Sequence, residues 1–180
     1  MYIIFIALIS SSFNRSNGED GEIIFEFQKN SDIGNWRTLN DGVMGGNSTS
    51  LIKINKSGYG IFQGNVSTEN NGGFASVRYS CDIKVGSYSS IAFRVKGDGK
   101  EYQFRIKNKS SDFESYITSF TTTGKWQTIQ INLSDLYPVF RGRELNKENF
   151  NFSHFEELSF LIANKKDESF KLFIDKIKFK

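Results

Sequence analysis

Apolar side chains recur at every second position along much of this chain, and this alternation limits the fold more than any other feature of the sequence. Residues 91–96 (IAFRVK) and 102–107 (YQFRIK) both show it. A period of two places alternate side chains on one face of a β-strand. Because Gly97-Asp98-Gly99 lies between the two segments, we expect them to form an antiparallel hairpin.

The same spacing predicts further strands and brings the expected number to about ten. So many half-buried strands hide their apolar faces only if a second sheet covers the first. The expected fold class is therefore all-β, a two-sheet jelly-roll sandwich. No segment has a sustained apolar period of 3.6, so helix is expected only as short turns at 134–137 or 146–149. The further strands are predicted at 23–27, 51–54, 59–66, 74–79, 116–120, 129–133, 158–162 and 170–174.

The length of 180 residues favours one compact domain over two. Residues 2–9 are a continuous apolar run, followed by Ser10, Ser11 and Ser12, which is the order found in a secretory signal peptide. The run is shorter than the roughly 20 apolar residues of a membrane-spanning helix. We therefore expect residues 1–20 to be a signal peptide and polar leader, and residues 21–180 to be a single β-sandwich domain. A buried first strand is the alternative for the apolar run.

Composition excludes several classes of function. The formal charge is only +3, from 23 Lys and Arg against 20 Asp and Glu, which is too small for a nucleic-acid-binding surface. One Cys and one His leave no intrachain disulfide and no Cys/His zinc site. Neither phosphate-binding glycine motif is present. The sequence therefore predicts no nucleic-acid partner and no cofactor.

Catalysis also lacks a convincing set of residues. His154 is the only histidine, and Cys81 has no basic neighbour in the sequence that would lower its pKa. Asp41, Glu69 and Asp98 could supply a carboxylate pair for glycoside hydrolysis only if two of them faced each other across a cleft. Each lies in a turn-forming segment, which already explains its presence. We therefore expect a protein that is not an enzyme.

Two glycine-rich corners are the candidate recognition sites. Asn40-Asp41-Gly42-Val43-Met44-Gly45-Gly46 follows Trp36, and Asn70-Asn71-Gly72-Gly73 precedes Phe74. Glycine permits positive φ and close approach of the backbone, while Asn and Asp hold turns or bind ligands. A tight structural turn and a ligand-binding loop both fit these residues. Trp36 could stack on a sugar ring or belong to the core.

Two arginine positions carry the same ambiguity. Arg78 lies in the strand after the second corner, where it could bind a carboxylate or a sugar hydroxyl, or brace the loops through a salt bridge to Asp41. Arg141 belongs to the basic turn Arg141-Gly142-Arg143. The candidate residues for binding a ligand or partner are thus Trp36, Asn40, Asp41, Asn70, Asn71, Arg78 and Arg141.

Several uncommon strings in one order make the chain similar to a known family. After Trp36 come NDGVMGG at 40–46, FQGNVSTENNGGFASVR at 62–78 and VKGDGKEYQFRI at 95–106, followed by FRGR at 140–143 and the closing segments LSFLIANK and FKLFIDKI. Together they resemble the complex I intermediate-associated protein 30 family, the NADH:ubiquinone oxidoreductase assembly-factor domain.

The resemblance implies a galactose-binding-like jelly roll and a non-enzymatic role. Mitochondrial members of the family are chaperones that hold membrane-arm intermediates of respiratory complex I, so the implied partner is a protein. The leader lacks the arginine-rich pattern of a mitochondrial transit peptide. We expect export to the periplasm or the extracellular space if the leader is cleaved, and a mitochondrial location only by family analogy. An exported carbohydrate-binding module, with a glycan as its ligand, is the alternative function.

Overall fold

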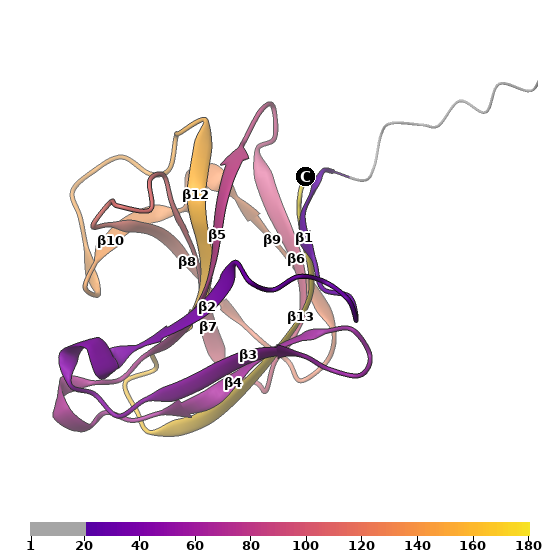
Figure 1. The fold of residues 1–180 in the computed structure, drawn as a ribbon. Helices are drawn as coiled ribbons and strands as arrows, with labels where there is room; N and C mark the ends of the chain where they lie inside the picture. The colour runs from indigo at the N-terminus through magenta and orange to yellow at the C-terminus, as the bar shows by residue number, and fades with distance from the viewer. Residues whose placement is uncertain (1–20) are drawn as a thin grey trace, which may run out of the picture.

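The computed structural model describes residues 21–180, so the expected leader at 1–20 lies outside the described residues. The described chain forms two antiparallel β-sheets packed face to face (Figure 1). The expected all-β, two-sheet sandwich is confirmed. Within residues 21–180, no helix is long and apolar enough to cross a membrane.

The six-stranded sheet has the order β3-β4-β13-β6-β9, with β1 also paired to β13. Its strands are β1 (Ile23–Glu26), β3 (Thr49–Ile54), β4 (Gly60–Val66), β6 (Ser90–Lys96), β9 (Gln127–Asn132) and β13 (Glu168–Phe179).

The seven-stranded sheet has the order β11-β10-β8-β7-β12-β5-β2. Its strands are β2 (Trp36–Asn40), β5 (Ala75–Lys84), β7 (Glu101–Lys107), β8 (Ser115–Thr121), β10 (Tyr137–Phe140), β11 (Arg143–Glu144) and β12 (His154–Ile162). Sequence analysis missed β2, β10 and β11, because these short strands show little alternation.

The core lies between the sheets and is built from the alternate residues that the pattern predicted. Phe93 comes from the six-stranded sheet, and Phe104 and Phe160 come from the seven-stranded sheet; all three are at most 1% exposed. The Phe93 ring centroid lies 5.0 Å from that of Phe104 and 5.2 Å from that of Phe160. Aromatic pairs at such distances add to the stability gained by burying their area.

The predicted hairpin of residues 91–96 and 102–107 is wrong. Both segments are strands, but β6 pairs with β13 and β9, whereas β7 pairs with β8 and β12. The loop between β6 and β7 therefore crosses from one sheet to the other. Alternation fixed which side chains of each strand are buried, and both strands bury theirs in the same core from opposite sides.

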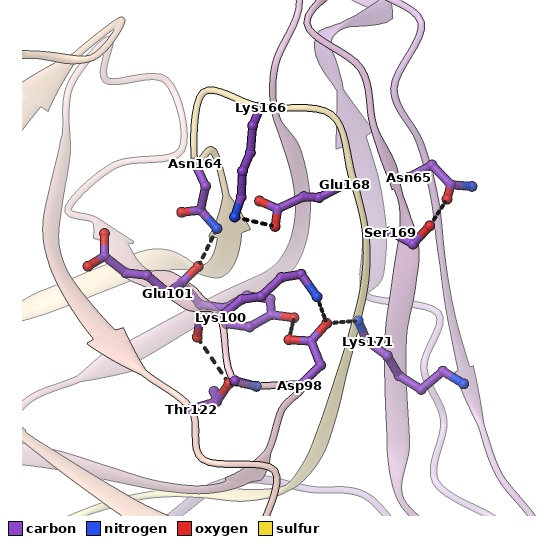
Figure 2. A network of polar contacts seen from close by, with 12 residues as sticks. Asn65, Asp98, Lys100, Glu101, Thr122, Asn164, Lys166, Glu168, Ser169 and Lys171 are labelled. Atoms are coloured by element: carbon purple, nitrogen blue, oxygen red, sulfur yellow. Dashed lines mark hydrogen bonds and ion pairs between the residues drawn. The ribbon is translucent and has the colours of Figure 1, made fainter.

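Asp98 holds this crossing loop in place (Figure 2). Its carboxylate accepts hydrogen bonds from the Lys100 ammonium at 2.8 Å, the Tyr102 hydroxyl at 2.9 Å and the Lys171 backbone N–H at 2.9 Å. Lys171 belongs to β13, whereas Tyr102 lies in β7 and Lys100 directly precedes that strand. The carboxylate thus joins the two sheets at their shared corner.

The described helical segments are short 3₁₀ turns. They are η1 (Asp41–Met44), η2 (Glu69–Asn71) and η3 (Leu133–Asp135). η3 overlaps the turn expected at 134–137, whereas residues 146–149 contain no helix. The corners η1 and η2 follow β2 and β4 and lie together at the lower left of Figure 1.

Candidate functional site

The two glycine-rich corners are joined by one buried carboxylate. Asp41 is fully buried. It accepts hydrogen bonds from the Ser48 N–H at 2.9 Å and the Ser48 hydroxyl, and from the Gly73 N–H at 2.6 Å and the Phe74 N–H at 3.2 Å. Burial raises the pKa of Asp41, but these hydrogen bonds outweigh it and hold the pKa below its ordinary value.

The glycines around Asp41 are required by its position. A Cβ atom on Gly46 would lie 2.4 Å from the Asp41 carboxyl carbon, and one on Gly72 would lie 2.7 Å from its Oδ2. Both distances are too short for non-bonded atoms. The motif at 40–46 and the motif at 70–73 thus form one structural joint, in which the carboxylate has no room for a ligand.

The remaining corner candidates have different surroundings. Trp36 is 5% exposed and belongs to the core, where its ring stacks on Tyr79 with centroids 4.9 Å apart. The side-chain oxygen of Asn40 accepts a hydrogen bond from Ser50 at 2.6 Å. Asn70 and Asn71 are exposed, with φ of 54° and 60°, a left-handed conformation that Asn adopts more readily than most residues.

The two arginine candidates lie apart from these corners. Arg78 does not pair with Asp41, which corrects the bracing expected from sequence; its Nη1 lies 3.4 Å from Glu157 Oε1 on β12. Asp41 is already saturated by backbone and hydroxyl donors, and Arg78 faces away from it on the outer side of β5. Arg141 is exposed in the turn between β10 and β11, with its guanidinium 5.2 Å from the Phe140 ring centroid.

Arg78 belongs to a line of side chains across the outward face of the seven-stranded sheet. Strand register places Arg37 of β2 opposite Arg78, Arg78 opposite Ser159 of β12, and Ser159 opposite Arg105 of β7. We call these four residues the arginine row. Their neighbours along each strand, such as Val77, Phe104 and Phe160, point into the core. Residues opposite each other on adjacent strands share a face, so the row faces away from the core.

Glu157 neutralises one end of the arginine row. Its side chain is 4% exposed, and its Oε2 accepts a hydrogen bond from Arg37 at 3.0 Å while Oε1 faces Arg78. Arg37 also donates to the Ser80 hydroxyl at 2.9 Å. A buried carboxylate held between two guanidinium groups gives this part of the face a fixed geometry.

Arg105 has no such counterion. Its Nε and Nη2 donate to the amide oxygen of Gln103 at 3.0 and 2.8 Å, and it forms no ion pair with a carboxylate of residues 21–180. Burial lowers the pKa of Arg105 to about 10, and the nearby charge of Arg78 acts in the same direction. This part of the face thus contains three guanidinium groups and a single carboxylate, that of Glu157, which pairs with Arg37 and Arg78 only. The outward face therefore carries a surplus of partly buried positive charge.

Sequence reasoning found Arg78 but missed Arg37, Arg105 and Glu157. Each occupies an outward position of a strand, where polar residues are the rule and attract no notice. One signal was available: residues 102–107 alternate strongly, so Arg105 had to point to the face opposite Phe104. Only the pairing of β2, β5, β12 and β7 places it in line with the others.

The acidic residues and the cysteine that were considered for catalysis do not form a reactive set. Asp41 and Asp98 are each saturated by donors of the fold, and Glu69 accepts from the Asn47 amide at 2.7 Å. Burial raises the pKa of the Cys81 thiol to about 12, which keeps it protonated and unreactive. No group of three or more His, Cys, Asp and Glu side chains within residues 21–180 is arranged to hold a metal ion.

Two antiparallel sheets packed face to face define a β-sandwich, and solved carbohydrate-binding modules have a similar fold. A family 11 carbohydrate-binding module from Clostridium thermocellum, solved in complex with a β-1,3-1,4-mixed-linked tetrasaccharide, is similar in structure, with a TM-score of 0.68. The match covers 89% of this chain and 95% of that one at 23% sequence identity, and it shows the fold alone.

The chain belongs to the complex I intermediate-associated protein 30 family, whose sequence model matches residues 25–174. The resemblance seen in the motifs is therefore confirmed. Complex I intermediate-associated protein 30 of Drosophila melanogaster is 22% identical over 86% of this chain, and the Mus musculus protein of the same name is 22% identical over 87%. The chain spans only 61% and 55% of the lengths of these two mitochondrial relatives.

Proposed function

We propose that this chain is a non-catalytic binding protein that holds a protein partner on the outward face of its seven-stranded sheet. One observation carries the proposal: three arginines lie together on that face beside a single carboxylate, which pairs with only two of them. Arginine is enriched in protein interfaces, because its planar fork makes several directed hydrogen bonds at once.

The surroundings of the arginine row support a protein partner. Ile117, Val139 and Leu161 are at most 5% exposed but lie outside the main core cluster. Register places Ile117 opposite Arg105 and Tyr137, and Leu161 opposite Gln103 and Ser76. Buried apolar side chains beside the row lower the local polarity, which strengthens charged hydrogen bonds from the arginines to a partner. The names of the relatives, which describe association with intermediates of complex I, agree with such a role.

A photo-crosslinking side chain introduced at a single position tests this proposal. Ser119 and Thr128 are both exposed strand residues, but Ser119 lies on β8 of the seven-stranded sheet and Thr128 on β9 of the six-stranded sheet. In the native host, crosslinks from position 119 should converge on one protein that mass spectrometry identifies, whereas position 128 should not capture it. Equal capture of that protein from both positions, or no capture from 119, would refute the proposal.

A carbohydrate-binding module is the second candidate, and the aromatic residues of the six-stranded sheet favour it. Trp126 is partly exposed, with the Tyr59 ring centroid 4.6 Å away and the Arg94 guanidinium 4.4 Å from its own. Aromatic rings beside polar groups bind sugars through stacking and hydrogen bonds. The family 11 module with its bound tetrasaccharide shares the fold.

A glycan array with titration by tryptophan fluorescence separates the two candidates. If the chain is a carbohydrate-binding module, a glycan on the array should bind, and Trp126→Ala should abolish binding while the melting temperature changes little. If the chain holds a protein partner, no glycan should bind at millimolar concentration. Phe113→Ala is a matched control, because Phe113 is also an exposed aromatic residue, 57% exposed, in the loop between β7 and β8.

A further inference from the structure

The arginine row contains hydrogen-bond donors that the protein itself does not use. The Nε atom of Arg78 is buried without a hydrogen-bond partner among the described residues. Arg105 donates through Nε and Nη2 to the neutral amide of Gln103, and no described hydrogen bond involves its Nη1. A buried donor without a partner costs free energy, and a buried charge without a counterion costs more. The arginine row therefore lacks a hydrogen-bond acceptor for Arg78 Nε and a counterion for Arg105.

Ser159, which is only 5% exposed, lies between the two arginines on the sheet. Arg78 and Arg105 flank it on the neighbouring strands, so their backbones are about 10 Å apart, twice the usual strand spacing. Ser159 has a short side chain, whereas each arginine is long enough to extend above it. A small anionic group placed over Ser159 would lie within reach of both guanidinium groups and of the serine hydroxyl.

The charges that face this point leave it positive. Glu157 is already engaged by Arg37 and Arg78. Lys107, opposite Glu157 on β7, directs its ammonium to the carbonyl oxygens of Ser110 and Asp112. Gln103 is neutral. An incoming anion would thus meet Arg105, whose guanidinium has no carboxylate partner and whose Nη1 makes no described hydrogen bond, and Arg78, which is shared with Glu157.

We infer that the space over Ser159, between Arg78 and Arg105, is a seat for a carboxylate, and that the protein partner supplies it from the side chain of an acidic residue. This inference rests on the proposed function and specifies its chemistry. Guanidinium groups bind carboxylates through paired, directed hydrogen bonds. Ile117, opposite Arg105 on β8, is buried, so the surroundings of Arg105 on that side are apolar, which strengthens a charged hydrogen bond there.

The seat is tested with short peptides whose central residue alone differs. The probe is the acetylated and amidated peptide Gly-Ser-Glu-Ser-Gly, and the control peptide has Gln in place of Glu. Titrations are followed by NMR of the arginine Nε–H signals, assigned with Arg78→Lys and Arg105→Lys. We expect the Glu peptide to shift the signals of Arg78 and Arg105 and to bind at least tenfold more tightly than the Gln peptide.

Variants of the protein separate a built seat from general attraction between charges. Arg105→Gln should weaken the Glu peptide at least tenfold, whereas Lys53→Gln removes the same charge from an exposed position on the other sheet and should change binding less than twofold. Ser159→Val fills the seat without a change in charge and should also weaken binding. Melting temperatures verify that each variant is folded. Equal losses in Arg105→Gln and Lys53→Gln would overturn the inference.

Further arms identify the anion and keep this inference distinct from the proposed function. A phosphoserine peptide or glucuronic acid that bound the seat more tightly than the Glu peptide would overturn the assignment to an acidic side chain. If crosslinking from position 119 captures a partner but the Glu peptide does not bind, the seat is refuted and the proposed function stands. If the Glu peptide binds as expected but no partner is captured, the proposed function fails and the carboxylate preference stands.

Discussion

Asp41 shows how much one buried side chain contributes to this fold. Its carboxylate is the common acceptor for two loops that are far apart in the sequence, through Ser48 on one side and Gly73 and Phe74 on the other. Without it, backbone N–H groups of the second loop would lose their acceptor. The aspartate that appeared to be a recognition residue is the residue that builds the corner.

Asp41→Asn should therefore lower the free energy of unfolding by roughly 3 kcal/mol, since hydrogen bonds to a charged acceptor are lost and buried donors lose a partner. The pKa of Asp41 is below its ordinary value in the folded protein. Its charge therefore stabilises the fold fully above the unfolded pKa of about 3.9, and this contribution is lost as the pH falls through the lower, folded value.

Urea unfolding of the wild type and Asp41→Asn at pH 6 and at pH 3 checks this expectation. The stability difference should be large at pH 6 and smaller at pH 3. Asp98 and Glu114 also have lowered pKa values, but they titrate in both proteins, so the difference isolates Asp41. A deficit that is the same at both pH values would show that the charge of Asp41 is not responsible.

Gly45 tests the backbone at the same corner. Its φ of +88° lies in the left-handed region, and a Cβ atom there would meet nothing within 4 Å. Gly45→Ala should therefore cost about 1 kcal/mol through backbone strain alone. Gly45→Asn should cost less, because Asn tolerates this conformation better. Thermal unfolding of both variants measures the difference, and an Asn variant no better than the Ala variant would argue against strain as the cause.

At the scale of the element, β3 is held at the edge of its sheet by a close contact with β4. A Cβ atom on Gly64 would lie 1.9 Å from the carbonyl oxygen of Thr49 and 2.7 Å from the Cα atom of Ser50. Both of these atoms are backbone, so they can move only if β3 moves. Gly64 is thus the residue that lets the edge strand dock.

Gly64→Ala should detach β3 and reduce stability by roughly 2 kcal/mol, as overpacking does elsewhere. Hydrogen exchange should accelerate most at the amides of β3. Gly42→Ala is the control, since a Cβ atom there meets nothing within 4 Å and its φ is not in the left-handed region. If exchange accelerates evenly over both sheets, the contact is not local to β3.

Element by element, the sequence predicts the existence of strands better than their partners. Alternation identified β6 and β7 because one face of each is buried. It could not show that they lie in different sheets, since a hairpin and a crossing loop bury the same residues. The strand pairings decide between the two, and the hydrogen bond from the Lys171 N–H that holds the crossing loop ends on Asp98, 73 residues away. The arginine row has the same origin: its members become neighbours only through long-range register.

For the molecule as a whole, β1 fastens the two sheets together. It pairs with β13 of the six-stranded sheet, while Phe25 and the following Phe27 pack against Trp36 of the seven-stranded sheet with ring centroids 5.3 and 5.1 Å apart. Phe27 is 3% exposed. The first described strand therefore belongs to the shared core rather than to one layer.

Phe27→Ala should destabilise the protein by roughly 3 kcal/mol, the usual cost of a large aromatic truncation in a core. Because the gap opens beside Trp36, its fluorescence should shift to the red in a Trp126→Phe background. Ile23→Ala in β1 is the control, since Ile23 is 54% exposed and should cost less than about 0.5 kcal/mol. Loss of stability without a shift in emission would mean that Phe27 does not shield Trp36.

The pairing of β1 with β13 also brings the two ends of the described chain together, since the Phe179 N–H donates to the Glu22 carbonyl oxygen at 2.8 Å (Figure 1). Both strands belong to the six-stranded layer. A circularly permuted version, joined by a short linker here and reopened at an exposed turn such as Gly86, should thus retain the architecture. For the same reason, a fluorescent tag or surface tether attached at Lys180 would leave from that layer, so that an immobilised molecule could still present the opposite face to solution.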